Sequence, residues 1–417
     1  MSIHNLPRPK TLLLALATSA ALLALAVMPT LSAAQEVSDI QSNGNLHLRG
    51  YGSGFIEGNT HAINANTARG GFPGQPGLSM IDQMYFQFML PQAQSGKKHV
   101  PIGIVHGCCL NTKSWQTTPD GRMGWDEYFV RQGFDTFMMD QVGRARSGFD
   151  PVAYQSVRLG LTPCVPAVVG GILIACPQNP NILIASDQFA WNVFRWGTTP
   201  CTTSPCSSTT TPHPDLKFPI NTIGVGAGSN TQFFNMVIPD MTATLSGAPA
   251  PADPAGFYNS PSQMAKLATQ VGGITLMGHS QSSAFPTRAA LQPGSGCYPY
   301  TTAAACKVKG IIQLETGCFA NLTAAEIDAL KHIPILVVDG DYFAAGSRPP
   351  ASCTTMMNQI NGAGGDMKYA LLPALTPGSI YPGSPGPMPG IEHMMMIGTK
   401  NIEVANFLIG WMNSRGL

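Results

Sequence analysis

One short stretch of the sequence constrains the fold more than any other. The apolar run Gly273–Met277 is followed at once by Gly278-His279-Ser280-Gln281-Ser282. A continuous apolar run is typical of a strand buried on both faces of a parallel sheet. Gly-x-Ser-x followed by a small residue is typical of a sharp strand-to-helix turn that exposes a serine hydroxyl. The stretch therefore predicts an α/β chain with Ser280 as its candidate nucleophile; the alternative is a chance turn, because short motifs also occur by coincidence.

The first 34 residues have the order of a secretory signal peptide. Arg8 and Lys10 precede an apolar stretch from Thr11 to Leu31, and the small residues Ser32–Ala34 follow it. An uncleaved membrane anchor is the alternative, since the apolar stretch is long enough to span a bilayer. No later stretch has the pattern of a membrane span, so we expect a secreted or periplasmic protein with no membrane span after signal cleavage.

The charge pattern argues against a nucleic-acid partner. The chain carries 23 Lys and Arg against 22 Asp and Glu, and its basic residues are scattered along the sequence. Proteins that bind nucleic acid usually gather basic side chains on one face. We therefore expect a small-molecule or polymeric substrate and no nucleic acid.

Ten cysteines in an exported chain indicate disulfides, because the compartments outside the inner membrane are oxidising. Their order along the chain favours local bridges. The expected pairs are Cys108–Cys109, Cys164–Cys176, Cys201–Cys206, Cys297–Cys306 and Cys318–Cys353. A metal site is the alternative, but neither C-x-x-C nor H-E-x-x-H spacing occurs, so we expect no metal.

Strand and helix patterns divide the chain into a core and an insertion. Residues 35–149 and 262–417 alternate the two patterns, which is typical of a mostly parallel sheet flanked by helices. Residues 150–261 hold four of the cysteines and show no sustained period. A structureless loop of that length is implausible inside a compact domain, so we interpret this segment as an inserted lid or subdomain. We expect the aromatic residues of this segment either to line an apolar pocket or to form the insertion's own core. They are Trp191, Phe194, Trp196, Phe233 and Phe234.

The core patterns give specific element boundaries. The expected strands are Leu46–Tyr51, Met84–Met89, Val100–Val105, Thr136–Met139, Gly273–Met277, Gly310–Leu314, Ile333–Asp339 and Met367–Leu372. The expected helices are Trp125–Gln132, Ala284–Leu291 and Asn401–Met412.

A serine hydroxyl attacks an ester only with a base within hydrogen-bond reach and a carboxylate that orients the base. In chains with this strand-to-helix turn the order is serine, acid, histidine. Of nine histidines, only His393 falls between the last expected strand and the final helix, where the base belongs. Glu315 ends one expected strand, and Asp339 and Asp341 end the next, so all three remain candidates for the acid.

Negative charge develops on the substrate carbonyl oxygen during the attack. It is stabilised by N–H donors, which together form the oxyanion hole. One donor comes from the residue after the serine, here Gln281, and one from the loop after the third strand. His106-Gly107-Cys108-Cys109 lies in that loop. A bridge between its adjacent cysteines would hold the backbone rigid, and two buried free thiols are the alternative.

Taken together, these motifs resemble a family of bacterial secreted α/β-hydrolase esterases with a vicinal disulfide at the oxyanion hole. The resemblance extends thinly from about Tyr51 to the C-terminus and rests on His106-Gly107-Cys108-Cys109, Asp140-Gln141-Val142-Gly143-Arg144-Ala145-Arg146-Ser147, Gly278-His279-Ser280-Gln281-Ser282, Glu315-Thr316-Gly317 and His393-Met394-Met395. It implies the α/β-hydrolase fold, Glu315 as the acid, and Cys108 and Gln281 as the oxyanion donors. It also implies that a homodimer is possible. Cys297, Cys306 and the long insertion depart from the family pattern, so the family's pocket shape is not carried over.

The resulting hypothesis is a serine esterase that hydrolyses carboxylic esters through an acyl-enzyme intermediate and needs no cofactor. The alternative within enzymes is a depolymerase or lactonase, which acts on a polymeric or cyclic ester. A different class is a binding protein on a hydrolase scaffold without catalytic activity, which we disfavour because all three triad residue types occur in order.

Overall fold

A computed structural model describes residues 41–417, apart from residues 42, 68, 93–98, 149, 162, 164–166, 170–171, 175–181, 226–229 and 242–258. The expected signal peptide, residues 1–34, and the expected pair Cys164–Cys176 lie outside the described residues. Within the described part of the chain, no helix has the length and apolar character needed to cross a membrane.

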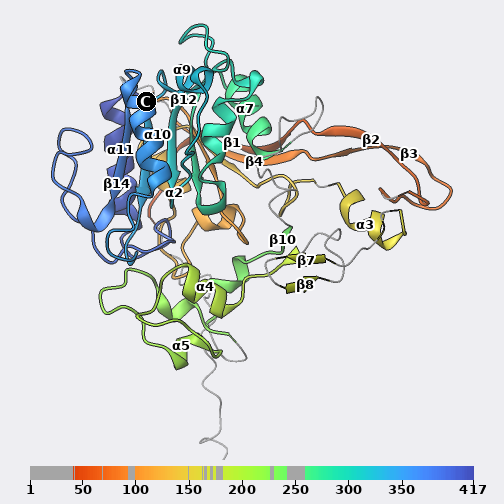
Figure 1. The fold of residues 1–417 in the computed structure, drawn as a ribbon, viewed down its shortest axis with the longest axis horizontal. Helices are drawn as coiled ribbons and strands as arrows, with labels where there is room; N and C mark the ends of the chain where they lie inside the picture. Colours follow the sequence, from red (N-terminus) through yellow and green to blue (C-terminus); the bar gives the residue numbers. More distant parts are fainter. Residues whose placement is uncertain are drawn as a thin grey trace, which may run out of the picture.

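An eight-stranded sheet forms the centre of the molecule (Figure 1). Its order is β1-β4-β6-β5-β11-β12-β13-β14. The strands from β6 to β14 are parallel, whereas β4 runs antiparallel to both β6 and β1. The strands are β1 Leu48–Ile56, β4 Met84–Pro91, β5 Ile102–Val105, β6 Thr136–Met139, β11 Ile274–His279, β12 Val308–Leu314, β13 Ile335–Asp339 and β14 Met367–Leu371. The parallel core, its flanking helices and the strand-to-helix turn after β11 are those of the α/β-hydrolase fold.

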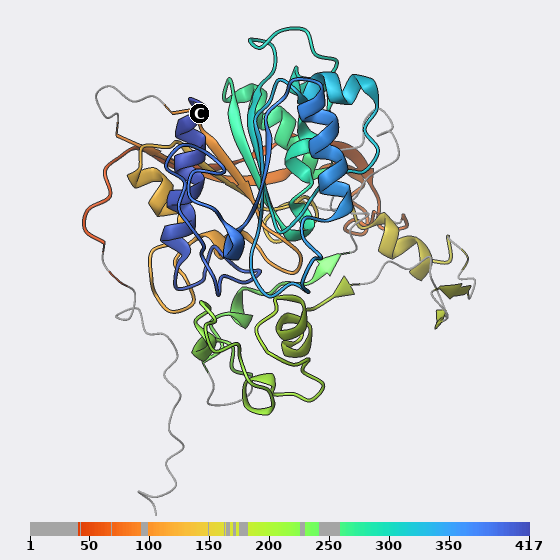
Figure 2. The ribbon, with the colours of Figure 1, turned by 60° about the vertical axis from the view of Figure 1, so that its left-hand side comes forward.

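Helices cover both faces of this sheet, and Figure 2 shows α10 and α11 on opposite sides of it. One face carries α2 Trp125–Arg131 and α11 Asn401–Ser414; the other carries α7 Ser260–Gln270, α8 Phe285–Ala290, α9 Ala324–Leu330 and α10 Ala351–Gly362. Side chains alternate between the two faces along a strand. In β13, Leu336 and Val338 pack in the core under α11, while Ile335 and Val337 pack in the core under α10. Burial on both sides explains why these strands are continuous apolar runs.

Every expected core strand and helix is present, with boundaries shifted by a few residues. Other elements were not predicted. Strands β2 Asn59–Ile63 and β3 Gly77–Ile81 form a hairpin that projects from the body (Figure 1). Helices α7, α9 and α10 also lack a prediction, although Asn259 caps α7 and Thr323 caps α9 with a capping box.

The described part of the insertion consists of short elements. These are α3 Val152–Arg158, β7 Ala167–Val169, β8 Ile172–Ile174, β9 Ile182–Leu183, α4 Asp187–Val193, α5 Cys206–Thr209 and β10 Asp240–Met241. Trp191, Phe194, Trp196 and Phe233 are buried and pack on one another, with the rings of Trp196 and Phe233 centred 5.1 Å apart. These aromatic residues therefore form a core for the insertion, continuous with the core under α11.

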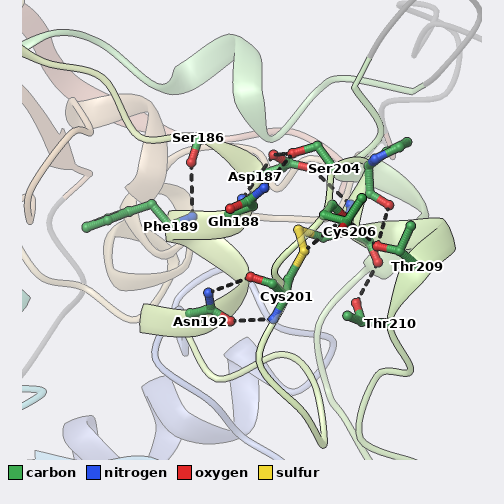
Figure 3. Close-up of a disulfide and its surroundings, with 12 residues drawn as sticks. Ser186, Asp187, Gln188, Phe189, Asn192, Cys201, Ser204, Cys206, Thr209 and Thr210 are labelled. Carbon is green, nitrogen blue, oxygen red and sulfur yellow. Dashed lines mark hydrogen bonds between the residues drawn. A yellow bond between two sulfur atoms is a disulfide. The ribbon is translucent and has the colours of Figure 1, made fainter.

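Three disulfides join cysteines in the pairs expected from sequence order. The S–S distances are 2.04 Å for Cys201–Cys206, 2.06 Å for Cys297–Cys306 and 2.01 Å for Cys318–Cys353. Figure 3 shows how the first of them is fixed to α4.

Both ends of α4 hold the Cys201–Cys206 loop. Near the start of the helix, Asp187 accepts hydrogen bonds from the Cys206 N–H at 2.9 Å and the Ser204 hydroxyl at 2.6 Å. Near its end, Asn192 accepts from the Cys201 N–H at 2.7 Å and donates to the Cys201 carbonyl at 3.1 Å. The disulfide loop and the helix therefore form one unit.

Replacing both Cys201 and Cys206 with serine should loosen this unit. Opening a loop this short should lower the free energy of unfolding by about 2 kcal/mol, as measured by denaturant unfolding. Limited proteolysis should then cut the insertion near α4 faster than in the wild type. The matched control is the double replacement of Cys297 and Cys306 with serine, which should leave cleavage of the insertion unchanged. Equal cleavage rates in the two double variants would contradict the assignment.

Candidate active site

The turn after β11 presents the Ser280 hydroxyl at the carboxyl edge of the sheet. Ser280 has a φ of 56°, a left-handed conformation that costs a non-glycine residue roughly 1–2 kcal/mol. The turn is also tight, because a Cβ at Gly278 would lie 2.1 Å from the Ser282 carbonyl oxygen. Only glycine fits at position 278, as the motif requires.

Ser282 stands where many such turns have glycine, and its hydroxyl has a structural task. The hydroxyl oxygen accepts a hydrogen bond from the His279 N–H at 3.0 Å and lies 3.0 Å from the Val105 carbonyl at the end of β5. The side chain therefore ties the turn to the neighbouring strand.

His393 lies between Ser280 and Glu315. Its Nε2 is 2.9 Å from the Ser280 hydroxyl oxygen, and its Nδ1 is 2.9 Å from Glu315 Oε2. The Phe194 ring stacks on the imidazole with centroids 5.0 Å apart. The His279 ring fixes the backbone here, because its Nε2 lies 2.9 Å from the His393 carbonyl. The three side chains thus form one continuous hydrogen-bonded row.

Glu315 follows β12 directly and is almost fully enclosed. Its Oε1 accepts a hydrogen bond from the Gly340 N–H at 2.8 Å, and both carboxylate oxygens accept from Arg195 Nη2, at 3.0 and 2.9 Å. Burial alone would raise the pKa of this carboxyl. The positive charge of Arg195 and the hydrogen bonds from His393 and Gly340 outweigh burial and hold the pKa well below its usual value. Glu315 is therefore ionised at neutral pH.

The other two acid candidates make different contacts. Asp339 accepts hydrogen bonds from the hydroxyls of Thr316 and Tyr369 and pairs with Arg348 at 2.9 Å. Asp341 accepts from the N–H groups of Tyr342 and Gly390, at 2.6 and 2.8 Å. Of the three carboxylates, Glu315 is the one that contacts the imidazole.

The loop after β5 lies against the serine. A Cβ at Gly107 would be 2.9 Å from the Ser280 Cβ, so this backbone approaches more closely than any other residue type would allow. Cys109 has a φ of 62°, and its carbonyl accepts a hydrogen bond from the Ile238 N–H of the insertion at 2.9 Å. On the other side, Arg144 Nη1 donates to Gln281 Oε1 at 2.5 Å. The two segments expected to supply oxyanion donors, at Cys108 and Gln281, therefore flank the hydroxyl.

The expected bridge within this loop is a separate question. The sulfur atoms of Cys108 and Cys109 lie 2.6 Å apart. This is longer than the roughly 2.05 Å of a disulfide bond, although it is far shorter than a contact between sulfur atoms that are not bonded. The vicinal bridge remains a prediction.

A second carboxyl lies beside the site. Glu392 is buried, and its Oε2 accepts a hydrogen bond from the Met394 N–H at 2.6 Å. Burial raises the pKa of this carboxyl to about 8, so it is mostly protonated at neutral pH. The run Met394–Met396 that follows His393 is buried as well.

Arg195 and Glu392 are the site residues that the sequence analysis missed, whereas Phe194 was among the aromatic residues named there. Arg195 is 120 positions away from Glu315 along the chain, and the insertion that carries it has no sustained pattern. The one local signal is a cation between two aromatic residues, Phe194 and Trp196, and it is too common to indicate a site. Among the described residues, no group of three or more His, Cys, Asp or Glu side chains could hold a metal ion.

Comparisons with known proteins support the fold assigned from the strand order. The solved structure of a novel bacterial esterase is similar to this chain, with a TM-score of 0.67 and 29% sequence identity, over 90% of this chain and 99% of the esterase. A probable secreted lipase, phiG, of a fungus (Fungal sp., strain ATCC 74256) is 34% identical over 68 residues, which is 16% of this chain and 18% of the lipase. No protein-family model matches the chain.

The state of Cys108 and Cys109 can be tested by peptide mapping of the exported protein. We expect that iodoacetamide added under denaturing conditions modifies neither residue until a reductant is present. Cys201 and Cys206 serve as an internal reference in the same digest. Alkylation of Cys108 without reduction, while Cys201 stays protected, would remove the vicinal bridge.

Proposed function

We propose that this chain is an exported serine esterase that hydrolyses carboxylic esters through an acyl-enzyme intermediate. The observation that carries the proposal is the row of Ser280, His393 and Glu315, with both linking distances at 2.9 Å. A hydroxyl, an imidazole and a carboxylate in this order are the parts needed for nucleophilic attack on an acyl carbon. The likeness to a bacterial esterase supports an ester as the substrate. The three disulfides support an oxidising compartment.

In the first half-reaction, His393 Nε2 takes the Ser280 proton as the hydroxyl oxygen attacks the ester carbonyl. Glu315 accepts the Nδ1–H hydrogen bond and stabilises the imidazolium that forms. The N–H groups of Cys108 and Gln281 hold the oxyanion. The imidazolium then protonates the departing alkoxide and leaves Ser280 acylated.

In the second half-reaction, water replaces the alcohol. His393 removes a proton from the water, which attacks the acyl carbon, and the returning proton regenerates the Ser280 hydroxyl. The acid leaves, and no cofactor is consumed. Donors that are rigidly held at the oxyanion contribute a factor of about 10²–10³ to turnover, so the tight contact between the Gly107 backbone and Ser280 favours this chemistry.

The nucleophile can be identified with a fluorophosphonate probe. We expect the folded protein to be labelled on Ser280 alone, and the Ser280→Ala variant to be unlabelled, as read by peptide mass spectrometry. A panel of short and long acyl esters, lactones and a polyester film would then define the substrate class. Folded protein that resists labelling and hydrolyses none of these substrates would overturn the proposed function.

The acid can be identified with two isosteric variants. Glu315→Gln removes the charge that stabilises the imidazolium, so kcat should fall by a factor of about 10³–10⁴. Asp341→Asn is the matched control, because Asp341 accepts only turn N–H groups through its side chain, and it should keep kcat within about tenfold. Steady-state kinetics on one chromogenic ester measures both variants. The reverse ranking would move the acid to Asp341.

A further inference from the structure

The turn that follows α4 in the insertion reaches the base and the acid at the same time. Phe194 stacks on the His393 ring with an angle of 10° between the planes, and Arg195 binds both oxygens of Glu315. The Arg195 side chain is 13% exposed and that of Glu315 is 2% exposed, so solvent screens the pair little. The insertion therefore supplies part of the environment of the catalytic row.

The backbone at Arg195 is of a kind that usually selects glycine. Arg195 has a φ of 62° and follows the last residues of α4, and the Trp196 N–H donates to the Trp191 carbonyl at 3.1 Å. These are the features of a Schellman cap, whose left-handed residue is most often glycine because it has no Cβ. Capping the helix does not need an arginine here. The side chain must therefore account for the residue.

The guanidinium is fixed from two further directions. Its Nε donates to the Asp341 carbonyl at 2.8 Å, and its central carbon lies 3.8 Å from the centre of the Phe343 ring. Arg348 stacks on the same ring at 3.6 Å. A planar guanidinium held in this way orients a carboxylate through a defined geometry, which a flexible ammonium cannot do.

We propose that Arg195 is a positioning residue for the ester hydrolysis proposed above: it fixes the Glu315 carboxylate against His393 and opposes charge on the imidazole. Its Nη1 lies 3.5 Å from His393 Nδ1, the nitrogen that faces Glu315. A cation at that distance disfavours a second cation on the ring. Arg195 thus balances Glu315, which would otherwise favour the imidazolium before substrate binds. This inference rests on the proposed function.

The direction of the pH effect follows from this balance. Without Arg195, the negative charge of Glu315 is no longer balanced and favours the protonated imidazole. A protonated imidazole cannot act as a base, so the variant should need a higher pH than the wild type for the same activity. The other titratable or charged groups around the site are His106, His279, Asp339, Asp341, Arg348 and Glu392. Burial lowers the pKa of His279 to about 3 and raises that of Glu392 to about 8, so neither group changes charge between pH 5 and 7. Neither group therefore accounts for a shift of the acid limb that follows the removal of Arg195.

The test is the pH dependence of kcat/KM for the Arg195→Gln, Arg195→Lys and Arg348→Gln variants on a chromogenic ester. Gln keeps the backbone constraint and removes the charge, so Arg195→Gln should move the acid limb up by about one pH unit and lower kcat about tenfold. Arg195→Lys keeps a positive charge, so its acid limb should move by less than half of the shift seen in Arg195→Gln. The matched control, Arg348→Gln, removes the other guanidinium that stacks on Phe343 and should leave the limb in place.

Two results would overturn the proposal. One is an Arg195→Gln profile whose acid limb coincides with that of the wild type, and the other is an equal shift in Arg348→Gln. If Arg195→Gln does not fold, as judged by near-ultraviolet circular dichroism, Arg195→Gly takes its place with the same expected shift, because glycine accommodates the left-handed turn.

A substrate-free measurement separates this inference from the proposed function. NMR titration of the His393 ring should give a higher midpoint in Arg195→Gln than in the wild type. A wild type that hydrolyses no ester would overturn the proposed function alone. Identical NMR midpoints in active proteins would overturn the role of Arg195 alone.

Discussion

The buried charge of Glu315 is the constraint on which the rest of the site depends. Removing a carboxylate from water costs roughly several kcal/mol unless partners replace the lost hydration. Three separate segments provide those partners: the loop that carries His393, the Gly340 N–H after β13, and Arg195 from the insertion. Each contact stabilises the charge, and together they fix where the three segments lie. The acid is therefore also the point at which the insertion and the core are joined.

The sheet order explains how residues so far apart in sequence meet. Parallel strands place their carboxyl ends at one edge, and β5, β11, β12 and β13 are neighbours. The loop with Cys108 follows β5, Ser280 follows β11, Glu315 follows β12 and Gly340 follows β13. The adjacent strands β11 and β12 thus place Ser280 and Glu315 near each other. The loop before α11 places the His393 imidazole between them.

The core was predictable because its signals are local. Strands buried on both faces are apolar throughout, and the serine turn needs glycine at position 278 for a steric reason that the sequence shows directly. His393 could be placed from chain order alone. Glu315 could not, since Asp339 and Asp341 also follow strands, and the resemblance to a family was needed to favour it. The hairpin and the helices α7, α9 and α10 were not predicted, although Asn259 and Thr323 are recognisable caps.

The structure of the insertion could not be predicted from the sequence, for a different reason. Its order comes from cross-links and long-range contacts, such as the pair between Arg195 and Glu315, and these leave no period in the sequence. Among its aromatic residues, Trp191, Trp196 and Phe233 pack into a core, whereas Phe194 joins that core and also stacks on the His393 ring. Composition alone does not distinguish these outcomes, because both need large apolar side chains.

The contacts of the insertion also limit how its sequence can be exchanged. Besides holding Glu315, this segment donates the Ile238 N–H to the Cys109 carbonyl, so it contacts both the proposed acid and the loop proposed to supply an oxyanion donor. A movement that carried α4 away as a rigid cover would leave a buried carboxylate without its counter-charge. Grafting this segment from a relative must therefore preserve a guanidinium at the left-handed position after α4, or the graft will disturb the row of Ser280, His393 and Glu315.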